Sequence, residues 1–231
     1  MSAPAEPADP AAVADAVAAA ARRLAAEGLL VGTAGNLSAR VPGAEQVVVT
    51  GSGVALAACT AADTVLVGLD GTVLAGTLAP TSELDLHLGV YADRPEAGAV
   101  VHTHAPFSTA VACVLDELPV LHYQQLLLGG AIRVAPYATF GTPELADHVR
   151  AALAGRQAAL MGNHGSVAVG ADLEAAAENA VLLEWLAALH HRASALGTPR
   201  VLTEQEQTDV VLAALARSYG TPTPRLQEET P

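Results

Sequence analysis

The chain has 231 residues, of which 52% are hydrophobic, 15% charged and 3% aromatic. This length and composition predict one globular domain over residues 1–231, with flexible tails at 1–8 and 221–231. A net charge of −13 without any basic block argues against nucleic acid or an anionic membrane as a partner. Because no apolar run approaches the roughly 18 residues of a membrane span, and the first ten residues do not resemble a signal peptide, we expect a cytoplasmic protein.

All eleven basic residues are arginines, and the sequence contains no lysine. This excludes lysine Schiff-base chemistry, a lysine-bound pyridoxal cofactor and the lysine-bearing phosphate loop of nucleoside triphosphatases. The two cysteines, Cys59 and Cys113, have no partner at metal-ligand or redox spacing. We therefore expect both to be buried and reduced.

Two glycine-rich loops flank the first predicted strand. Asp9 and Pro10 begin an alanine-rich helix that Gly28 ends, and G-T-A-G-N-L-S follows at 32–38. The strand at 47–49 leads into T-G-S-G at 50–53. Such loops can bind an anion through backbone N–H groups, or they can be two ordinary turns.

A hairpin and a helix come next. Residues 64–75 alternate around Asp70 and Gly71, which predicts a hairpin with a primed turn. An apolar pattern typical of a helix runs from Leu84 to about Arg94, with Thr81 or Ser82 as the N-cap. Glu83 then lies in the first turn, where its carboxylate complements the helix dipole.

Two histidines follow a predicted buried strand. Residues 99–101 predict a buried strand that continues into His102 and His104. Alternating side chains point to opposite faces of a strand, so these two imidazoles share a face about 7 Å apart. They could bind one metal ion, or they could be a hydrogen-bonded pair at a strand end.

The second half of the chain alternates helices and strands. His164 lies between glycines in a turn, Gly162 to Gly165, that joins two short strands. The other predicted elements are a helix at 106–115, an extended stretch at 118–123, a strand at 131–135, a helix from Pro143 to about 153, strands at 157–161 and 166–169, a helix from Asp172 to Gly197, and a last helix to about Ser218 behind a Thr203–Glu206 capping box. This order predicts an α/β fold with three α/β/α layers around a mixed, largely antiparallel sheet.

Seven short motifs stand in one order along the chain: G-T-A-G-N-L-S at 32–38, T-G-S-G at 50–53, P-T-S-E at 80–83, V-V-H-T-H-A at 100–105, L-H-Y at 121–123, P-Y-A-T-F-G-T at 136–142 and N-H-G at 163–165. The series resembles the class II aldolase/adducin family and, within it, the bacterial L-fuculose-1-phosphate aldolases. The resemblance extends from the first helix to Tyr219.

The resemblance implies a metal-dependent active site. Zinc, or another divalent transition metal, would be held by His102, His104 and His164. Glu83 would be the catalytic carboxylate and a fourth metal ligand in the absence of substrate, and Tyr123 a catalytic tyrosine from a neighbouring subunit of a homotetramer. The remaining residues implied to bind the phosphorylated sugar are Thr33, Asn36, Thr50, Gly51, Thr81, Ser82 and Tyr219.

The expected reaction is retro-aldol cleavage of a ketose 1-phosphate, such as L-fuculose 1-phosphate, to dihydroxyacetone phosphate and L-lactaldehyde. Without lysine, a divalent metal is the remaining means of stabilising the enediolate left by bond cleavage. A pentulose-phosphate 4-epimerase and a methylthioribulose-1-phosphate dehydratase would use the same three histidines. A non-catalytic, adducin-like interaction module is a further alternative, although such modules lack the metal ligands.

Overall fold

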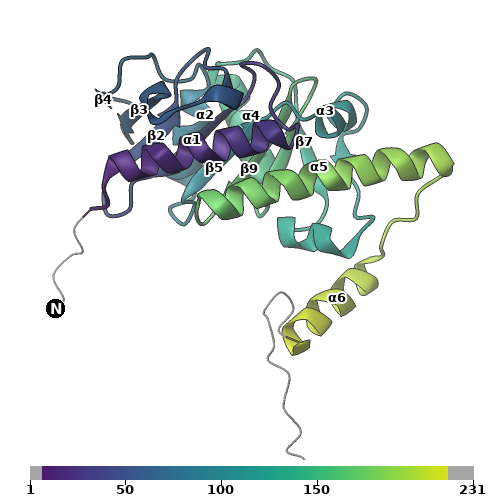
Figure 1. Ribbon diagram of the computed structural model, residues 1–231. Helices are drawn as coiled ribbons and strands as arrows, with labels where there is room; N and C mark the ends of the chain where they lie inside the picture. Colours follow the sequence, from purple (N-terminus) through teal and green to yellow (C-terminus); the bar gives the residue numbers. More distant parts are fainter. Residues whose placement is uncertain (1–6, 218–231) are drawn as a thin grey trace, which may run out of the picture.

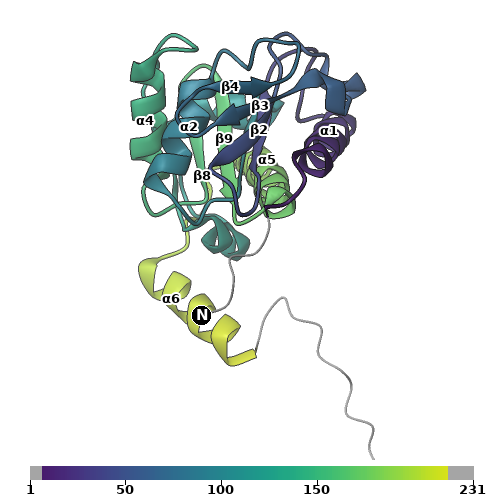
Figure 2. The ribbon, with the colours of Figure 1, turned by 90° about the vertical axis from the view of Figure 1, so that its left-hand side faces the viewer.

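A nine-stranded sheet forms the middle layer of the computed structural model, which describes residues 7–217 (Figures 1 and 2). Its strand order is β4-β3-β2-β1-β5-β9-β8-β7-β6, and every pair is antiparallel except β7 with β8. The strands are β1 (Asn36–Arg40), β2 (Gln46–Thr50), β3 (Thr64–Gly68), β4 (Val73–Ala75), β5 (Ala99–Thr103), β6 (Glu117–Leu118), β7 (Ile132–Ala135), β8 (Ala158–Met161) and β9 (Gly165–Gly170).

Helices cover both faces of this sheet. Figure 2 shows α1 and α5 on one side of the strands, and α2 and α4 on the other. The helical elements are α1 (Pro10–Ala26), η1 (Leu56–Ala58), η2 (Ala61–Asp63), α2 (Leu84–Asp93), α3 (Pro106–Ala112), η3 (Tyr123–Leu128), α4 (Pro143–Leu153), α5 (Leu173–Leu196) and α6 (Glu204–Arg217). The predicted three-layer α/β/α fold with a mixed, largely antiparallel sheet is confirmed.

Strand alternation divides the core into two apolar layers. Leu37 and Val101 face α1 and α5, whereas Val49 and Val100 face α2 and α4. The central strands β1 and β5 pair with Asn36 opposite His102. The side chains of Asn36 and His102 therefore lie on the α2 side of the sheet.

The caps predicted from the sequence position several helices. Asp9 Oδ1 accepts a hydrogen bond from Ala11 N–H at the start of α1, and Thr142 Oγ1 accepts one from Leu145 N–H at the start of α4. The Thr203–Glu206 capping box is also present.

Two local expectations were wrong. A type I′ or II′ turn needs a positive φ at its first central residue, which would be Asp70 here. Asp70 does not have a positive φ; only Gly71, the second central residue, has one, at +87°. The hairpin is instead closed by a turn with Gly71 N–H donating to Gly68 O, and the register between β3 and β4 shifts at Leu66 and Val67.

Cys113 is exposed rather than buried, because α3 ends at Ala112 and leaves this cysteine in the following turn; Cys59 is buried.

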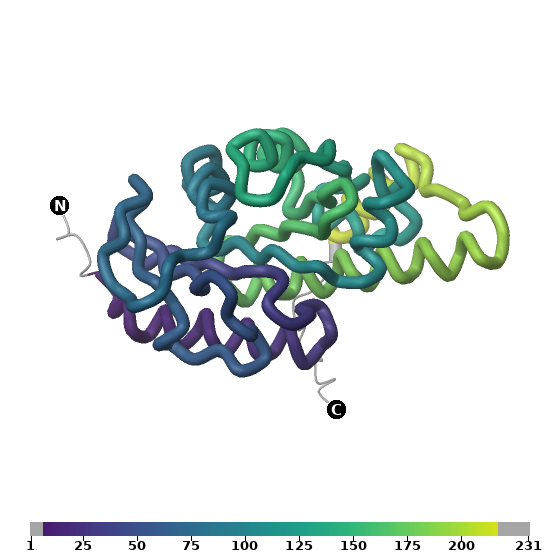
Figure 3. Tube along the Cα trace, turned by 90° about the horizontal axis from the view of Figure 1, so that it is seen from above, coloured from purple at the N-terminus to yellow at the C-terminus, as the bar shows by residue number. Residues whose placement is uncertain are grey.

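The C-terminal end of α5 and the whole of α6 lie beyond the sheet. Figures 1 and 3 show α5 running past the end of the sheet, and Figure 1 shows α6 below the layered body. α6 packs against η3, and Leu202 N–H donates to Val120 O at 2.8 Å. None of the helices described over residues 7–217 is both long and apolar enough to cross a lipid bilayer.

Candidate active site

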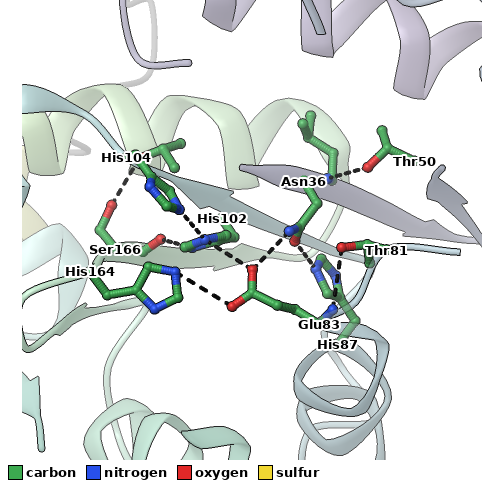
Figure 4. Close-up of polar contacts among 11 residues, drawn as sticks. Asn36, Thr50, Thr81, Glu83, His87, His102, His104, His164 and Ser166 are labelled. Carbon is green, nitrogen blue, oxygen red and sulfur yellow. Dashed lines mark hydrogen bonds and ion pairs between the residues drawn. The ribbon is translucent and has the colours of Figure 1, made fainter. Parts of the chain in front are cut away.

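Three histidines meet at one end of the central strands (Figure 4). His102 lies on β5, His104 follows the end of β5, and His164 lies in the turn between β8 and β9. Their ring centroids form a nearly equilateral triangle with sides of 4.8 to 4.9 Å. One ligating nitrogen from each ring lies within 4.8 Å of the others, so the predicted metal ligands are brought together.

A backbone carbonyl orients the buried His102. Its Nδ1–H donates to Ser166 O at 2.9 Å, because a carbonyl oxygen can only accept. In the neutral imidazole Nε2 then carries the lone pair, and Nε2 lies 2.9 Å from His104 Nε2. A carbonyl partner on the second nitrogen is typical of metal-binding histidines.

Glu83 completes the cluster from the opposite side. Its Oε2 lies 3.1 Å from His102 Nε2 and accepts a hydrogen bond of 2.9 Å from Asn36 Nδ2. Its Oε1 lies 3.6 Å from His164 Nε2, and this buried oxygen has no hydrogen-bond partner among residues 7–217. The carboxylate therefore faces the histidines.

The start of α2 differs from the sequence prediction. Neither Thr81 nor Ser82 is the N-cap; Glu83 occupies that position and makes no capping hydrogen bond. The N-cap therefore lies one residue after Ser82 and two after Thr81, and Thr81 Oγ1 accepts a hydrogen bond from Glu83 N–H in the turn before the helix. The Glu83 side chain is thus free to point at the histidines instead of capping the helix.

Burial and neighbouring charges shift the pKa values of these groups. Burial, with smaller contributions from His102 and His164, lowers the pKa of His104 to about 4. Burial also lowers the pKa of His164. Burial alone would raise the pKa of Glu83, but His102 and the hydrogen bond from Asn36 outweigh it and hold this pKa well below its usual value. At neutral pH His104 and His164 are therefore neutral, and the Glu83 carboxylate is ionised.

These groups fit a divalent cation. Two imidazole nitrogens only 2.9 Å apart need a proton or a cation between them, and the unpartnered Glu83 Oε1 is an anionic oxygen held out of water. Three histidines with one carboxylate form a donor set that suits zinc and leaves the carboxylate replaceable by substrate. The cluster could therefore hold the metal ion that the sequence predicts.

Glycines allow the chain segments of the site to approach closely. A Cβ on Gly165 would lie 2.2 Å from Thr103 O, which would push the turn carrying His164 away from β5. Gly35 has φ +95°, and a Cβ there would lie 2.8 Å from His102 O. Both positions therefore require glycine for the loops to pack against the histidine strand.

A cleft opens in front of the histidines between the two glycine-rich loops and the start of α2. Most residues predicted for substrate binding line it, together with Glu83, two of the three histidines and one aromatic side chain: Thr33, Ala34, Gly35, Asn36, Gly51, Ser52, Gly53, Thr81, Ser82, Glu83, His104, Phe140 and His164. These neutral donors and backbone N–H groups form a concave surface of the kind that binds phosphate.

Two of the predicted residues that the structure describes lie away from the cleft. Thr50 is buried behind the cleft, where its hydroxyl accepts a hydrogen bond from Leu37 N–H and its carbonyl one from Thr81 N–H. Tyr123 begins η3 and lines a separate groove against α6. Tyr219 lies outside the described residues.

Sequence reasoning missed two residues at or behind the cleft. Phe140 lines the cleft with an exposed ring. His87 is fully buried and contacts Asn36, and its spacing of four residues from Glu83 on a helix was the signal that could have identified it.

Comparisons with known proteins agree with this geometry. Residues 15–191 match the family model for the class II aldolase and adducin N-terminal domain. The chain is 40% identical over 193 residues to a 5-methylthioribulose-1-phosphate/5-deoxyribulose-1-phosphate aldolase of Rhodospirillum rubrum, covering 83% of this chain and 86% of that protein. It is 42% identical over 142 residues to an Escherichia coli K12 L-fuculose phosphate aldolase, covering 61% of this chain and 66% of that one. A solved L-fuculose 1-phosphate aldolase structure superposes with a TM-score of 0.84 at 32% identity, over 87% of this chain and 95% of that chain. The chain therefore belongs to the class II aldolase and adducin family.

Proposed function

We propose that this protein is a zinc-dependent aldolase that cleaves a ketose 1-phosphate to dihydroxyacetone phosphate and a short aldehyde. The observation that carries the proposal is the convergence of three histidines and the ionised Glu83 on one cleft lined by hydroxyl and backbone donors. Membership of a class II aldolase family supports a lyase reaction.

Three substrates are candidates. L-fuculose 1-phosphate would release L-lactaldehyde, whereas 5-deoxyribulose 1-phosphate and 5-methylthioribulose 1-phosphate, which appear in the relatives' names, would release other short aldehydes. All three share the phosphorylated three-carbon half, which we assign to the loops of Thr33, Gly51 and Ser82. The aldehyde half would then lie toward Phe140.

The mechanism moves one proton from the substrate's C4 hydroxyl to C3. When bound by His102, His104 and His164, a divalent cation would polarise the C2 carbonyl and stabilise the negative charge left when the C3–C4 bond breaks. In the aldol-forming direction the ionised Glu83, which lies on the cleft wall beside the histidines, would take the proton from C3. In cleavage Glu83 would first gain a proton from solvent and would then donate it to C3, which returns the carboxylate to its ionised form. Tyr123 from a neighbouring copy would take the proton from the C4 oxygen.

This role for Tyr123 requires an oligomer. Tyr123 lies outside the cleft of its own chain, in an apolar groove with Leu126, Leu127 and Val211. Leu127 and Leu215 beside this groove are exposed. We infer that these side chains contact further copies in a homotetramer whose active sites lie between subunits, and that the protein acts in the cytoplasm.

A coupled assay for dihydroxyacetone phosphate tests the proposal. Each of the three sugar phosphates is supplied to metal-loaded protein, to chelated protein and to chelated protein restored with zinc. We expect release from at least one substrate, loss of release on chelation and recovery with zinc. Release that survives verified metal removal, or no release from any of the three by zinc-loaded protein, would contradict the proposal.

A matched variant tests the role of Glu83. Glu83→Gln keeps the shape and the hydrogen-bond acceptor for Asn36, so bound zinc should remain while turnover falls roughly 10²- to 10⁴-fold. Metal content measured on the same preparation separates lost chemistry from lost metal. Turnover at the parent rate would show that Glu83 is not the proton-transferring group.

A further inference from the structure

A continuous line of buried hydrogen bonds leads from Glu83 into the core (Figure 4 shows the part nearest the site). Asn36 Oδ1 lies 2.5 Å from His87 Nε2, and His87 Nδ1 lies 2.6 Å from Ser38 Oγ. Ser38 Oγ lies 2.8 Å from the Tyr91 hydroxyl. All five side chains are buried, and His87 and Ser38 are 0% exposed.

The Glu83 carboxylate fixes which group donates and which accepts in the hydrogen bonds from Glu83 to Ser38. The Glu83 carboxylate can only accept, so the Asn36 amide donates to it and turns its Oδ1 toward His87. An amide oxygen also only accepts, so His87 carries its proton on Nε2. Burial lowers the pKa of His87 to about 3, so the ring is neutral and Nδ1 accepts from the Ser38 hydroxyl.

Two backbone periodicities place these groups in register. Glu83, His87 and Tyr91 follow one another at intervals of four along the start and body of α2, so they lie on one face of the helix. Asn36 and Ser38 are two residues apart on β1, so they share the face that α2 covers. The line therefore links one helix face to one strand face.

We propose that His87 is a positioning residue for the reaction: its Nε2–H holds the Asn36 amide in the one orientation that donates to Glu83. If the amide turned over, its oxygen would face the carboxylate and repel it, because neither group could donate. With Oε2 held by Asn36, Oε1 is directed toward His164 and the cleft. The kinetic part of this proposal rests on the aldolase function proposed above; the orientation of the amide does not.

A pair of substitutions at His87 separates positioning from packing. The amide N–H of His87→Gln can replace the Nε2–H, whereas His87→Leu fills similar space without a donor. Loss of a group that orients a ligand typically costs roughly 10- to 100-fold in activity or metal affinity. We expect that loss in kcat and in zinc affinity for His87→Leu, with a clear recovery of both in His87→Gln.

A control variant corrects for general destabilisation. Asn179 donates to Val169 O at 2.8 Å from the opposite side of the sheet, away from the cleft. Asn179→Ala should lower stability but leave kcat and zinc affinity near the parent values. Parent-like kcat and zinc affinity in His87→Leu, or equal losses in the Gln and Leu variants, would overturn the proposal.

A spectroscopic measurement tests the orientation without any turnover. In protein labelled with ¹⁵N-histidine, the signals of His87 are identified by their loss in His87→Gln. We expect the pattern of a neutral ring protonated at Nε2 at pH 7. A ring protonated at Nδ1 or at both nitrogens would overturn the proposal even if the Leu variant did not fold. Failure of the parent to release dihydroxyacetone phosphate would instead count against the proposed function alone.

Discussion

Asn163 is the one non-glycine residue among those described with φ in the left-handed region, at 54°. It directly precedes His164, a proposed metal ligand, in the turn between β8 and β9, and its side chain is exposed. Asparagine tolerates this conformation better than most residues, and a β-branched residue tolerates it worst. The backbone at this position therefore helps to aim the imidazole of His164 at the other ligands.

Substitutions at Asn163 should show how much stability depends on this left-handed backbone conformation. Asn163→Val should lower the free energy of unfolding by roughly 1–2 kcal/mol, because valine disfavours the left-handed region. Asn163→Gly, which adopts that region freely, should remain close to the parent. Urea denaturation of both variants gives the comparison, and equal stability of the two would contradict it.

The histidines and the glutamate of the candidate site were more predictable from the sequence than the buried residues that contact them. His102, His104, His164 and Glu83 belong to short motifs with a family pattern, and the structure brings them together. His87 does not stand out in the sequence, because its importance depends on α2 packing against β1. The burial and donor direction of Asn36 likewise depend on tertiary contacts that no local pattern specifies.

At the scale of elements, one carboxylate connects the helix after the histidine strand to the long helix α5. Glu184 accepts hydrogen bonds from Phe107 N–H and Ser108 N–H at 2.8 Å, and from the Ser108 hydroxyl at 2.7 Å. These are unpaired donors of the first turn of α3, which begins two residues after His104. Glu184 thus anchors the segment that follows His104, a proposed metal ligand.

Removing this carboxylate should be costly. Glu184→Ala leaves three partly buried donors without a partner, and each such loss typically costs about 1–3 kcal/mol, so we expect at least that decrease in unfolding free energy. Glu178→Ala, an exposed site on the same helix, should change stability by less than about 0.5 kcal/mol. Thermal or urea unfolding of the pair tests this. A Glu184→Ala protein as stable as the Glu178→Ala control would rule out the anchoring role.

Element boundaries were predictable where the capping side chain bonds to a nearby residue of the sequence. They were not predictable where that side chain contacts a residue far away in the sequence. Asp9, Thr142 and Asp172 cap their helices as the sequence indicates. The start of α2 was misjudged because Glu83 is drawn toward the histidines, a partner that lies 19 and more residues away. The turn at Asp70 was misjudged because a dipeptide of this kind also suits a turn followed by a left-handed glycine.

For the whole molecule, the proposed metal binding would be coupled to folding. The ligands come from β5 and from the β8–β9 turn, while Glu83 comes from the start of α2, so the site exists only when the sheet and α2 are assembled. A ligand that binds only the folded state stabilises it by mass action. The layered architecture itself was predictable from the alternation of helices and strands, but the order of the nine strands was not, because pairing between distant segments leaves no local signal.

Zinc should therefore raise the thermal unfolding midpoint of chelated protein. At free zinc 100-fold above the dissociation constant the gain is about 2.7 kcal/mol, which corresponds to roughly 5–10 °C for a chain of this size. His104→Ala, which removes one ligand, should show a much smaller shift. Calorimetry with and without zinc provides the measurement. An equal shift in the two proteins would place the zinc elsewhere.

The pairing of Asn36 with His102, and of Leu37 with Val101, has a consequence for how the chain reaches its native state. A slip of one residue between β1 and β5 would turn a whole strand over. Imidazole and amide groups would enter the apolar layer beneath α1 and α5, and leucine and valine would enter the cleft. Each polar group left unsatisfied there would cost about 1–3 kcal/mol. The polar side chains of the proposed active site therefore also disfavour a shifted strand register during folding.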